Sequence, residues 1–166
     1  MPQPRVVTIS TGLAAPLRAL NGRTVLSGIA KAPVDGPVPV RRLGLQGDEQ
    51  ADLDAHGGLH KAVYAYPREH LPFWVAQRRE RGIAPFEAPL APGFVGENLL
   101  LAGVLECELW VGDTLHFDGS DCVLRVTWPR EPCYKFCAVM GFAQAARVMA
   151  QHEKTGFYLA VDQVGT

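Results

Sequence analysis

The sequence has little of what would place it in several common classes of protein. Its 166 residues carry a formal net charge of only −1, which argues against a general nucleic-acid or membrane-surface binder. No apolar run approaches the roughly 20 residues that a membrane-spanning helix needs. Residues 1–10 lack the basic, apolar and small-residue order of a signal peptide, so we expect a cytoplasmic protein.

Cysteine is also scarce. Four cysteines are too few for a disulfide scaffold in a chain of this length. Cys133 and Cys137 are four residues apart, but no second pair of cysteines or histidines with zinc-site spacing accompanies them. Cys107 and Cys122 lie in apolar, strand-like runs, and we expect them to be small buried hydrophobic residues.

Glycine and proline, by contrast, are frequent and evenly spread. The 17 glycines and 13 prolines keep the predicted elements short, which is typical of a β-rich fold. A chain of this length with 48% hydrophobic residues can bury a substantial core. We therefore predict one β-dominated domain over residues 1–166, a mixed β-barrel with a few peripheral α-helices.

Short strands account for most of the predicted elements. Residues 29–35 and 38–45 are predicted to pair with each other across the Asp35-Gly36-Pro37 turn. Residues 83–93 hold three prolines and are predicted to form an ordered surface loop. Other strands are expected within 6–32 and at 62–66, 94–100, 105–110, 115–117, 123–127 and 157–161.

Two segments, 67–81 and 142–154, have helical periodicity. Pro72 lies inside the first, so either its first turn is separate or the helix is kinked. The arginines of this helix are expected on a solvated face: Arg78, Arg79 and Arg81.

The most informative stretch surrounds Cys133, in the sequence Pro129-Arg130-Glu131-Pro132-Cys133-Tyr134-Lys135. The two prolines stiffen the approach to the cysteine. Arg130 and Lys135 are expected to lower the pKa of the thiol, and the thiolate is both a nucleophile and a metal ligand. A helix that begins near Cys133 would favour the thiolate further. The alternative is a loop cysteine with basic neighbours that have no role.

Several stretches, taken in order, resemble the MOSC family, named for the C-terminal domain of molybdenum cofactor sulfurases, and in particular its stand-alone YiiM-like branch. The similar segments cover roughly residues 29–157 and are Gly47-Asp48-Glu49-Gln50-Ala51-Asp52, His56-Gly57-Gly58, Lys61-Ala62-Val63, Tyr66-Pro67-Arg68-Glu69-His70, Gly96-Glu97-Asn98-Leu99, Gly112-Asp113 and 129–135.

The resemblance implies a mixed β-barrel with one functional cysteine, which corresponds to Cys133. In the family this cysteine is thought either to ligate molybdenum in a molybdopterin-type cofactor or to carry sulfur as a persulfide. Relatives of the YiiM type are associated with the reduction of N-hydroxylated bases such as hydroxylaminopurine. The pyridoxal phosphate domain of the sulfurases has no counterpart in this chain.

Basic residues would then anchor the cofactor. Arg130 and Lys135 are expected to neutralise its phosphate, because a guanidinium fork matches phosphate geometry. Lys61 and Arg68 would add positive charge at one end of the barrel, and Arg68 lies near a predicted helix start. The alternative for these residues is ordinary surface charge.

Two polar residues have two interpretations each. Asn98 suits the recognition of a pterin edge or the orientation of an oxo ligand, or else it satisfies backbone groups at a turn or bulge. His56 is expected to bind anions or donate a proton, or else to bond backbone structurally. Gly57 and Gly58 exclude a stable helix, so His56 and His60 do not form a helical zinc pair.

Other polar residues receive lesser roles. The aspartates are interpreted as turn formers rather than ligands of a hard metal: Asp48, Asp52 and Asp113. Cys137 is considered as a resolving thiol for Cys133, although helical spacing fits a disulfide poorly. Because the family's barrel continues beyond the point that corresponds to Thr166, either a partner chain supplies a strand or the barrel edge stays open.

The sequence thus predicts a cytoplasmic MOSC protein in which Cys133 ligates molybdenum and His56 assists catalysis. The expected activity is reduction of N-hydroxylated bases or amines, with an electron-donor protein as partner and a homodimer as a possible assembly. Two alternatives stay open: a sulfur carrier with a Cys133 persulfide and a sulfur donor as partner, and a non-catalytic module that binds or delivers the cofactor.

Overall fold

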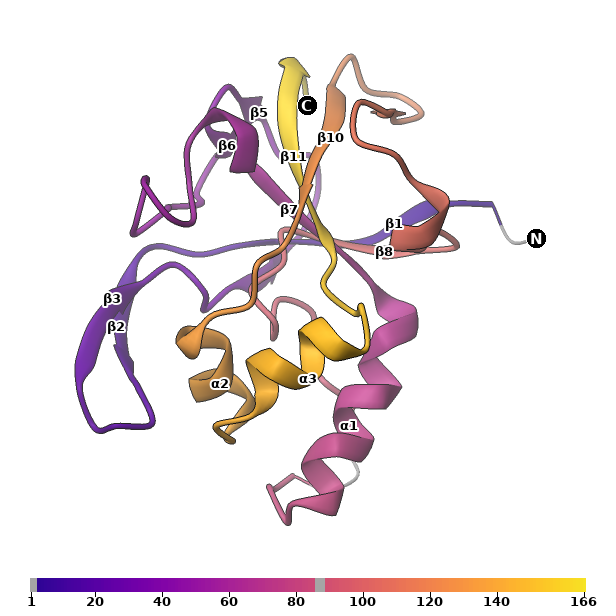
Figure 1. Cartoon of the computed structure of the whole chain (residues 1–166). Coiled ribbons are helices and arrows are strands. Elements are labelled where there is room, and N and C mark those ends of the chain that lie inside the picture. The colour runs from indigo at the N-terminus through magenta and orange to yellow at the C-terminus, as the bar shows by residue number, and fades with distance from the viewer. Residues whose placement is uncertain (1–2, 86–88) are drawn as a thin grey trace.

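The computed structural model describes residues 3–85 and 89–166. Its main feature is a seven-stranded mixed sheet with the strand order β4-β1-β8-β7-β11-β10-β9 (Figure 1). Among the strand pairs of the described residues in this sheet, β7–β8 is parallel and the others are antiparallel. The strands of this sheet are β1 (Arg5–Thr11), β4 (Ala32–Val34), β7 (Val63–Pro67), β8 (Leu99–Ala102), β9 (Thr114–His116), β10 (Val123–Pro129) and β11 (Phe157–Gln163).

Two hairpins and six short helical segments surround the sheet. The hairpins are formed by β2 (Ala15–Arg18) with β3 (Thr24–Ser27), and by β5 (Val40–Arg41) with β6 (Gly44–Leu45). The α-helices are α1 (Leu71–Glu80), α2 (Tyr134–Met140) and α3 (Ala145–Gln151). The 3₁₀-helices are η1 (Leu59–Lys61), η2 (Arg68–His70) and η3 (Glu106–Glu108).

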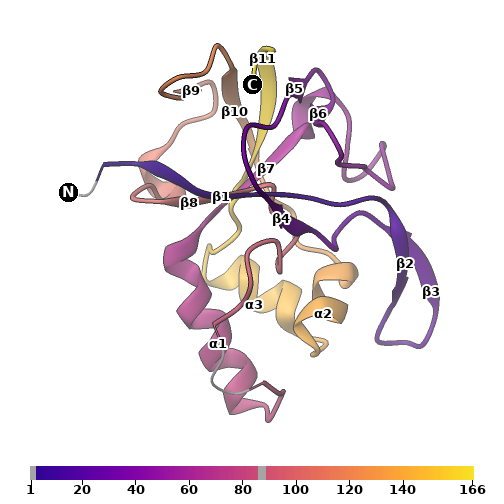
Figure 2. The ribbon, with the colours of Figure 1, turned by 180° about the vertical axis from the view of Figure 1, so that it is seen from behind.

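The period-2 alternation of the strands divides the core between the two faces of the sheet. In β7, Val63 and Ala65 join one apolar cluster, while Tyr64 and Tyr66 join the other. The first cluster also receives the β5–β6 hairpin through Val40, and the second receives the helices. Figure 1 and the view from behind in Figure 2 both show the three α-helices gathered on one side of the sheet.

The predicted β-dominated fold with peripheral helices is confirmed. The sheet does not close into a barrel within the part of the chain that the structure describes. Its two end strands, β4 and β9, do not pair with each other. The β5–β6 hairpin lies over one face instead, where the Val40 amide donates to the Gly165 carbonyl at 2.8 Å.

Two strand predictions are wrong, and a third, residues 94–100, is right only at its end, because β8 begins at Leu99. Residues 29–35 and 38–45 do not pair with each other: β4 pairs with β1, and β5 folds back onto β6. Pro33, Pro37 and Pro39 lack the amide hydrogens that a ladder between those segments would need. Residues 105–110 contain the η3 turn rather than a strand, and the Glu108 carboxylate accepts a hydrogen bond from the Leu105 amide at 2.7 Å.

The helix predictions are closer to the structure. The first turn of 67–81 is separate, because η2 precedes α1 and Pro72 lies in the first turn of α1. Arg78 is buried rather than solvated, since its Nη2 donates to the Ala84 carbonyl at 3.0 Å. The second helix begins at Ala145 rather than at 142.

Residues 86–88 of the predicted 83–93 loop lie outside the described residues. None of the helices described here has the length and apolar character to cross a membrane.

Gly156, which precedes β11, lets its backbone lie close to the backbone of Ala65, and any residue with a Cβ atom would clash there. Its φ is +65°, and a Cβ there would lie 2.5 Å from the Ala65 carbonyl oxygen. We expect Gly156→Ala to lower the free energy of unfolding by about 3–5 kcal/mol, from the left-handed backbone and the clash together. Gly119 is the matched control, because its φ is +79° but a Cβ would meet nothing within 4 Å. Urea unfolding should give Gly119→Ala a loss of only about 1–2 kcal/mol; equal losses would contradict the steric argument.

Candidate functional site

A cleft opens beside the N-terminal end of α2 and contains about 600 Å³ of empty space, part of it open to solvent. Its walls come from distant parts of the sequence, including the segment after β3, residues 48–56, β7 and β11. All of the predicted site residues except Arg68 line it: His56, Lys61, Asn98, Arg130, Cys133 and Lys135. Arg68 is exposed at the start of η2 and does not belong to the lining.

Cys133 occupies the residue before α2, with extended backbone at φ −131° and ψ 175°. Burial by itself raises the pKa of the thiol. A hydrogen bond from the His56 side chain, its charge, and the backbone amides of Phe136 and Lys135 outweigh burial and lower the pKa of Cys133 to about 7. The His56 side chain makes the largest lowering contribution, rather than the basic side chains that the sequence suggested. Cys133 is therefore partly thiolate at neutral pH.

Gln50 and Asp52 fix the loop that carries His56. The Gln50 side chain accepts a hydrogen bond from the Gly58 amide at 2.9 Å and donates one to the Lys61 carbonyl at 3.0 Å. The Asp52 carboxylate caps the turn that follows it, and its carbonyl accepts from the His56 amide at 2.9 Å. This loop brings His56 to Cys133 without an α-helix over residues 56–60, since the 3₁₀-helix η1 begins only at Leu59.

Arg130 is held by the protein itself. It is 6% exposed, and its Nη1 donates to the Val95 carbonyl at 2.8 Å and to Tyr64 Oη at 3.1 Å. Its guanidinium also lies over the rings of Tyr64 and Phe136. At least one of the guanidinium nitrogens of Arg130 is therefore already hydrogen-bonded to residues in the wall of the cleft.

Lys135 differs from the other cations of the cleft. It is only 9% exposed, yet across residues 3–85 and 89–166 it has no hydrogen-bond or ion-pair partner. Lys61 donates to the Ala55 carbonyl at 2.8 Å, and its Nζ lies 5.5 Å from the centroid of the Tyr158 ring. The Lys135 ammonium is not enclosed, because the enclosed side-chain atoms without partners among the described residues are Ser10 Oγ and Arg78 Nε. The Ala55 amide and, more weakly, the charge of Lys135 lower the pKa of Asp52. The unused hydrogen-bond donors of Lys135 are suited to an anion that enters the cleft.

Asn98 is fully engaged within the protein. Its Nδ2 donates to the Ser10 carbonyl at 3.2 Å and to Asp48 Oδ2 at 3.0 Å, and its Oδ1 accepts from the Tyr64 amide at 3.0 Å. These contacts match the interpretation of Asn98 as a residue that satisfies backbone groups. They also place the Asp48 carboxylate at the floor of the cleft.

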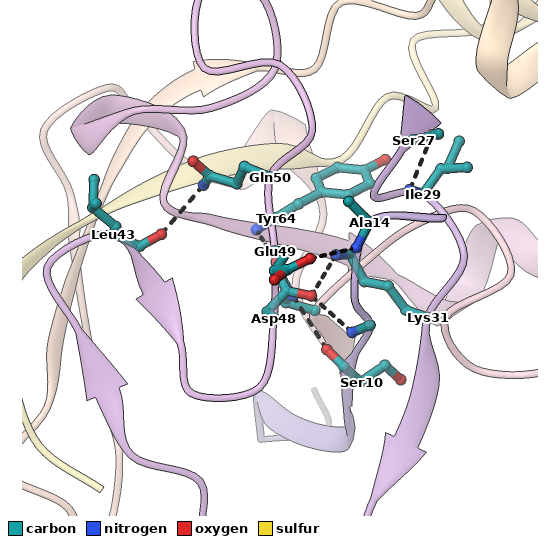
Figure 3. Close-up of polar contacts among 12 residues, drawn as sticks. Ser10, Ala14, Ser27, Ile29, Lys31, Leu43, Asp48, Glu49, Gln50 and Tyr64 are labelled. Atoms are coloured by element: carbon teal, nitrogen blue, oxygen red, sulfur yellow. Dashed lines mark hydrogen bonds and ion pairs between the residues drawn. The ribbon is translucent and has the colours of Figure 1, made fainter. Parts of the chain in front are cut away.

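Lys31 and Asp48 form a buried ion pair that the sequence analysis did not anticipate. Lys31 Nζ lies 2.5 Å from Asp48 Oδ1, and the two side chains are 7% and 6% exposed. Figure 3 shows Asp48 at the centre of this network, with Lys31 and Ser10 beside it. The only available signal for Lys31 was a charged residue within a strand-like run, since its partner lies 17 residues away.

The acidic residues considered as metal ligands bind protein groups instead. Asp48 accepts from the Gly12 amide at 2.9 Å as well as from Lys31, and Asp113 accepts from the Trp110 amide at 2.8 Å. Within the described chain, no group of three or more histidine, cysteine or acidic side chains is arranged to hold a metal ion.

The remaining cysteines lie away from the cleft lining. Cys137 is buried in α2, where its Sγ donates to the Ala143 carbonyl at 3.3 Å and accepts from the Ala146 amide at 3.4 Å. Cys122 is buried as expected, but Cys107 is exposed because the η3 turn replaces the expected strand.

Removing one member of the buried ion pair should be more harmful than removing both. Asp48→Leu leaves the Lys31 ammonium buried without a counter-charge, and we expect a loss of about 3–5 kcal/mol in the free energy of unfolding. Lys31→Met combined with Asp48→Leu should regain part of that loss, while the Gly12 amide and Asn98 Nδ2 lose their bonds to Asp48 in both variants. Urea unfolding of the two variants measures the difference; a double variant as unstable as Asp48→Leu would contradict this account.

The ionisation of Cys133 can be followed by its reaction with iodoacetamide, because only the thiolate reacts. The rate at Cys133, measured peptide by peptide by mass spectrometry, should rise with pH to a midpoint near 7. His56→Gln removes the largest interaction that lowers this pKa, so the midpoint should move upward by about one pH unit or more. Exposed Cys107 in the same sample is the internal control and should not shift. A midpoint unchanged by the His56 substitution would show that other groups ionise the thiol.

Comparison with known proteins gives a consistent result. The MOSC domain model matches residues 52–166. The chain is 36% identical over 166 residues to the uncharacterized protein YflK of Bacillus subtilis (strain 168), covering 99% of this chain and 71% of YflK. It is 38% identical over 135 residues to protein YiiM of Escherichia coli (strain K12), covering 81% of this chain and 57% of YiiM.

Two further matches extend the comparison. A protein named "Reductase" from Gibberella moniliformis (strain M3125 / FGSC 7600) is 32% identical over 148 residues, covering 89% of this chain but only 25% of its own length. The crystal structure of Escherichia coli YiiM superposes with a TM-score of 0.72 at 29% identity, over 99% of this chain and 65% of that one. The chain belongs to the MOSC domain family and, within it, to the YiiM-like proteins.

Proposed function

We propose that this MOSC protein binds a molybdopterin-type molybdenum cofactor in the cleft and reduces N-hydroxylated bases or amines. The observation that carries the proposal is the Cys133 thiol, partly ionised at neutral pH and accessible from a polar cleft. A thiolate is a soft ligand that suits molybdenum. His56, beside it, is the kind of side chain that most often transfers protons in enzymes.

The cleft has the donors that such a cofactor would need. Lys135 lines the cleft and its ammonium has no hydrogen-bond partner within the described residues, and a cofactor phosphate would provide one. Lys61, at the same cleft, adds a second ammonium whose contacts among the described residues are a backbone carbonyl and a ring. Cys133 would supply the protein's sulfur ligand to the metal, and Arg130 would add positive charge while remaining fixed to Val95. These residues fit a ligand with a soft metal and a phosphate.

The cofactor, an electron donor and the side chains of this protein would each have a separate role in the reaction. The cofactor, when bound, would supply two-electron redox chemistry. Reduction of an N–OH group to an N–H group consumes two electrons and two protons and releases water, so an electron-donor protein must supply the electrons. Among the chain's own residues, His56 would deliver a proton, while Lys135 and Lys61 would hold the phosphate.

The name of one relative supports a redox role. The Gibberella moniliformis protein is called "Reductase", although this chain matches only 25% of its length. That name favours a reductase over a module that only binds or delivers the cofactor. A persulfide carrier is the second candidate, because a thiol that is partly ionised and partly accessible also suits attack on the sulfane sulfur of a donor.

Replacing Cys133 tests the proposal directly. Protein made in a molybdenum-replete host should contain molybdenum and reduce hydroxylaminopurine when a reductant is supplied. Cys133→Ser should reduce the turnover rate by at least about 100-fold while leaving the unfolding midpoint unchanged, because oxygen is a poorer ligand for a soft metal. Cys107→Ser is the matched control, since that thiol is exposed outside the cleft, and it should keep the full rate.

Mass spectrometry of the freshly purified protein separates the candidates. A Cys133 that carries one additional sulfur, in protein free of molybdenum, would favour the persulfide carrier. Molybdenum that remains bound without any turnover would favour the delivery module. An unchanged reductase rate in Cys133→Ser would remove the assignment of this residue.

A further inference from the structure

Tyr158 is a rigidly held part of the cleft wall. It lies in β11, is 6% exposed, and its carbonyl accepts a hydrogen bond from Thr127 Oγ1 at 3.1 Å. Its ring centroid lies 5.4 Å from that of Tyr64 and 5.5 Å from Lys61 Nζ. Strand pairing and ring packing therefore fix this side chain before any ligand binds.

The two tyrosines of the neighbouring strand β7 have satisfied hydroxyl groups. Tyr64 Oη donates to the Thr155 carbonyl at 2.7 Å and accepts from Arg130. Tyr66 Oη donates to the Lys154 carbonyl at 3.0 Å and accepts from Trp74 Nε1 at 2.6 Å. These hydroxyls serve the packing of the helical side of the sheet.

The Tyr158 hydroxyl, by contrast, bonds no group in the described part of the chain. It is not sealed from solvent, because the enclosed side-chain atoms without partners there are Ser10 Oγ and Arg78 Nε. Since Tyr158 lines the cleft, its hydroxyl is open to that cleft. A buried tyrosine usually finds a partner for its hydroxyl, so this one is available to a ligand.

The surroundings of Tyr158 keep its hydroxyl a hydrogen-bond donor. Burial raises the pKa of Tyr158, whereas the nearby Arg130 charge lowers it and those of Cys133 and Glu131 raise it, with a net upward shift. The hydroxyl is therefore protonated at neutral pH. The effect of Cys133 on Tyr158 also indicates that the two groups act in one part of the cleft.

We propose that Tyr158 Oη donates a hydrogen bond to the oxygen of the substrate's N–OH group and so selects the N-hydroxylated compound over the corresponding amine. This inference rests on the proposed reductase function and adds the residue that recognises the oxygen to be removed. A site that bonds a substrate hydroxyl discriminates against an analogue that lacks it. The reduced amine product loses this contact, which favours its release.

Binding without turnover tests the inference. Isothermal titration calorimetry without reductant, on protein from a molybdenum-replete host, compares the affinities of hydroxylaminopurine and adenine. Wild type should prefer the hydroxylamine by about five- to ten-fold, the contribution of one hydrogen bond. Tyr158→Phe should bring this ratio close to one and leave the unfolding temperature unchanged, because the hydroxyl bonds nothing in the protein.

Tyr66→Phe is the matched control. It also removes a buried hydroxyl, but one outside the cleft lining that has two protein partners. This variant should unfold at a lower temperature and keep the wild-type affinity ratio.

The outcomes separate this inference from the proposed function. A wild-type preference that Tyr158→Phe leaves intact would overturn the role of Tyr158 alone, even with full reductase activity. A preference that depends on Tyr158, in protein that never reduces the compound, would sustain the binding role and overturn the reductase. A wild-type protein that binds neither compound would overturn both.

Discussion

The side chain of Asn98 joins the three segments on which the cleft is built. Its amide oxygen accepts from the Tyr64 backbone in β7, and its amide nitrogen donates to Ser10 in β1 and to Asp48. Its own backbone also bonds Tyr64 and Ser10, at 2.8 and 2.7 Å. Because Asn98 is buried, each of these groups would otherwise lack a partner at substantial cost. Hydrogen bonds from the Asn98 side chain and backbone therefore tie this part of the cleft to the sheet.

The polar groups around this floor divide into those the protein satisfies and those it leaves available. Lys31 is neutralised by Asp48, and Arg130 is bound to Val95 and Tyr64. The Lys135 ammonium and the Tyr158 hydroxyl line the same cleft but have no hydrogen-bond partner within the described residues. Lys31 and Arg130 thus stabilise the wall of the cleft, whereas Lys135 and the Tyr158 hydroxyl can bind a ligand that enters it. A cation and a neutral donor beside a partly ionised thiol suit a ligand that is anionic and rich in oxygen.

The reactivity of Cys133 depends on a contact between two loops. Cys133 follows β10, and His56 belongs to a loop between β6 and η1 that Gln50 holds in place. Burial alone would keep the thiol protonated, and the imidazole reverses this effect. Small displacements of the His56 loop would thus change the charge of the sulfur, which makes Gln50 part of the support of the site.

The sequence by itself determined the β-dominated class, the two main helices and the motif around Cys133, because these follow from local periodicity, turn residues and an ordered set of short motifs. It also named six of the residues that line the cleft. Tertiary structure alone decided that β4 pairs with β1, that His56 rather than Lys135 makes the larger contribution to ionising Cys133, and that Lys31 lies on Asp48. The physical reason is that pairing partners, burial and pKa depend on residues distant in sequence, and no local pattern records whether a hydroxyl such as that of Tyr158 finds a partner.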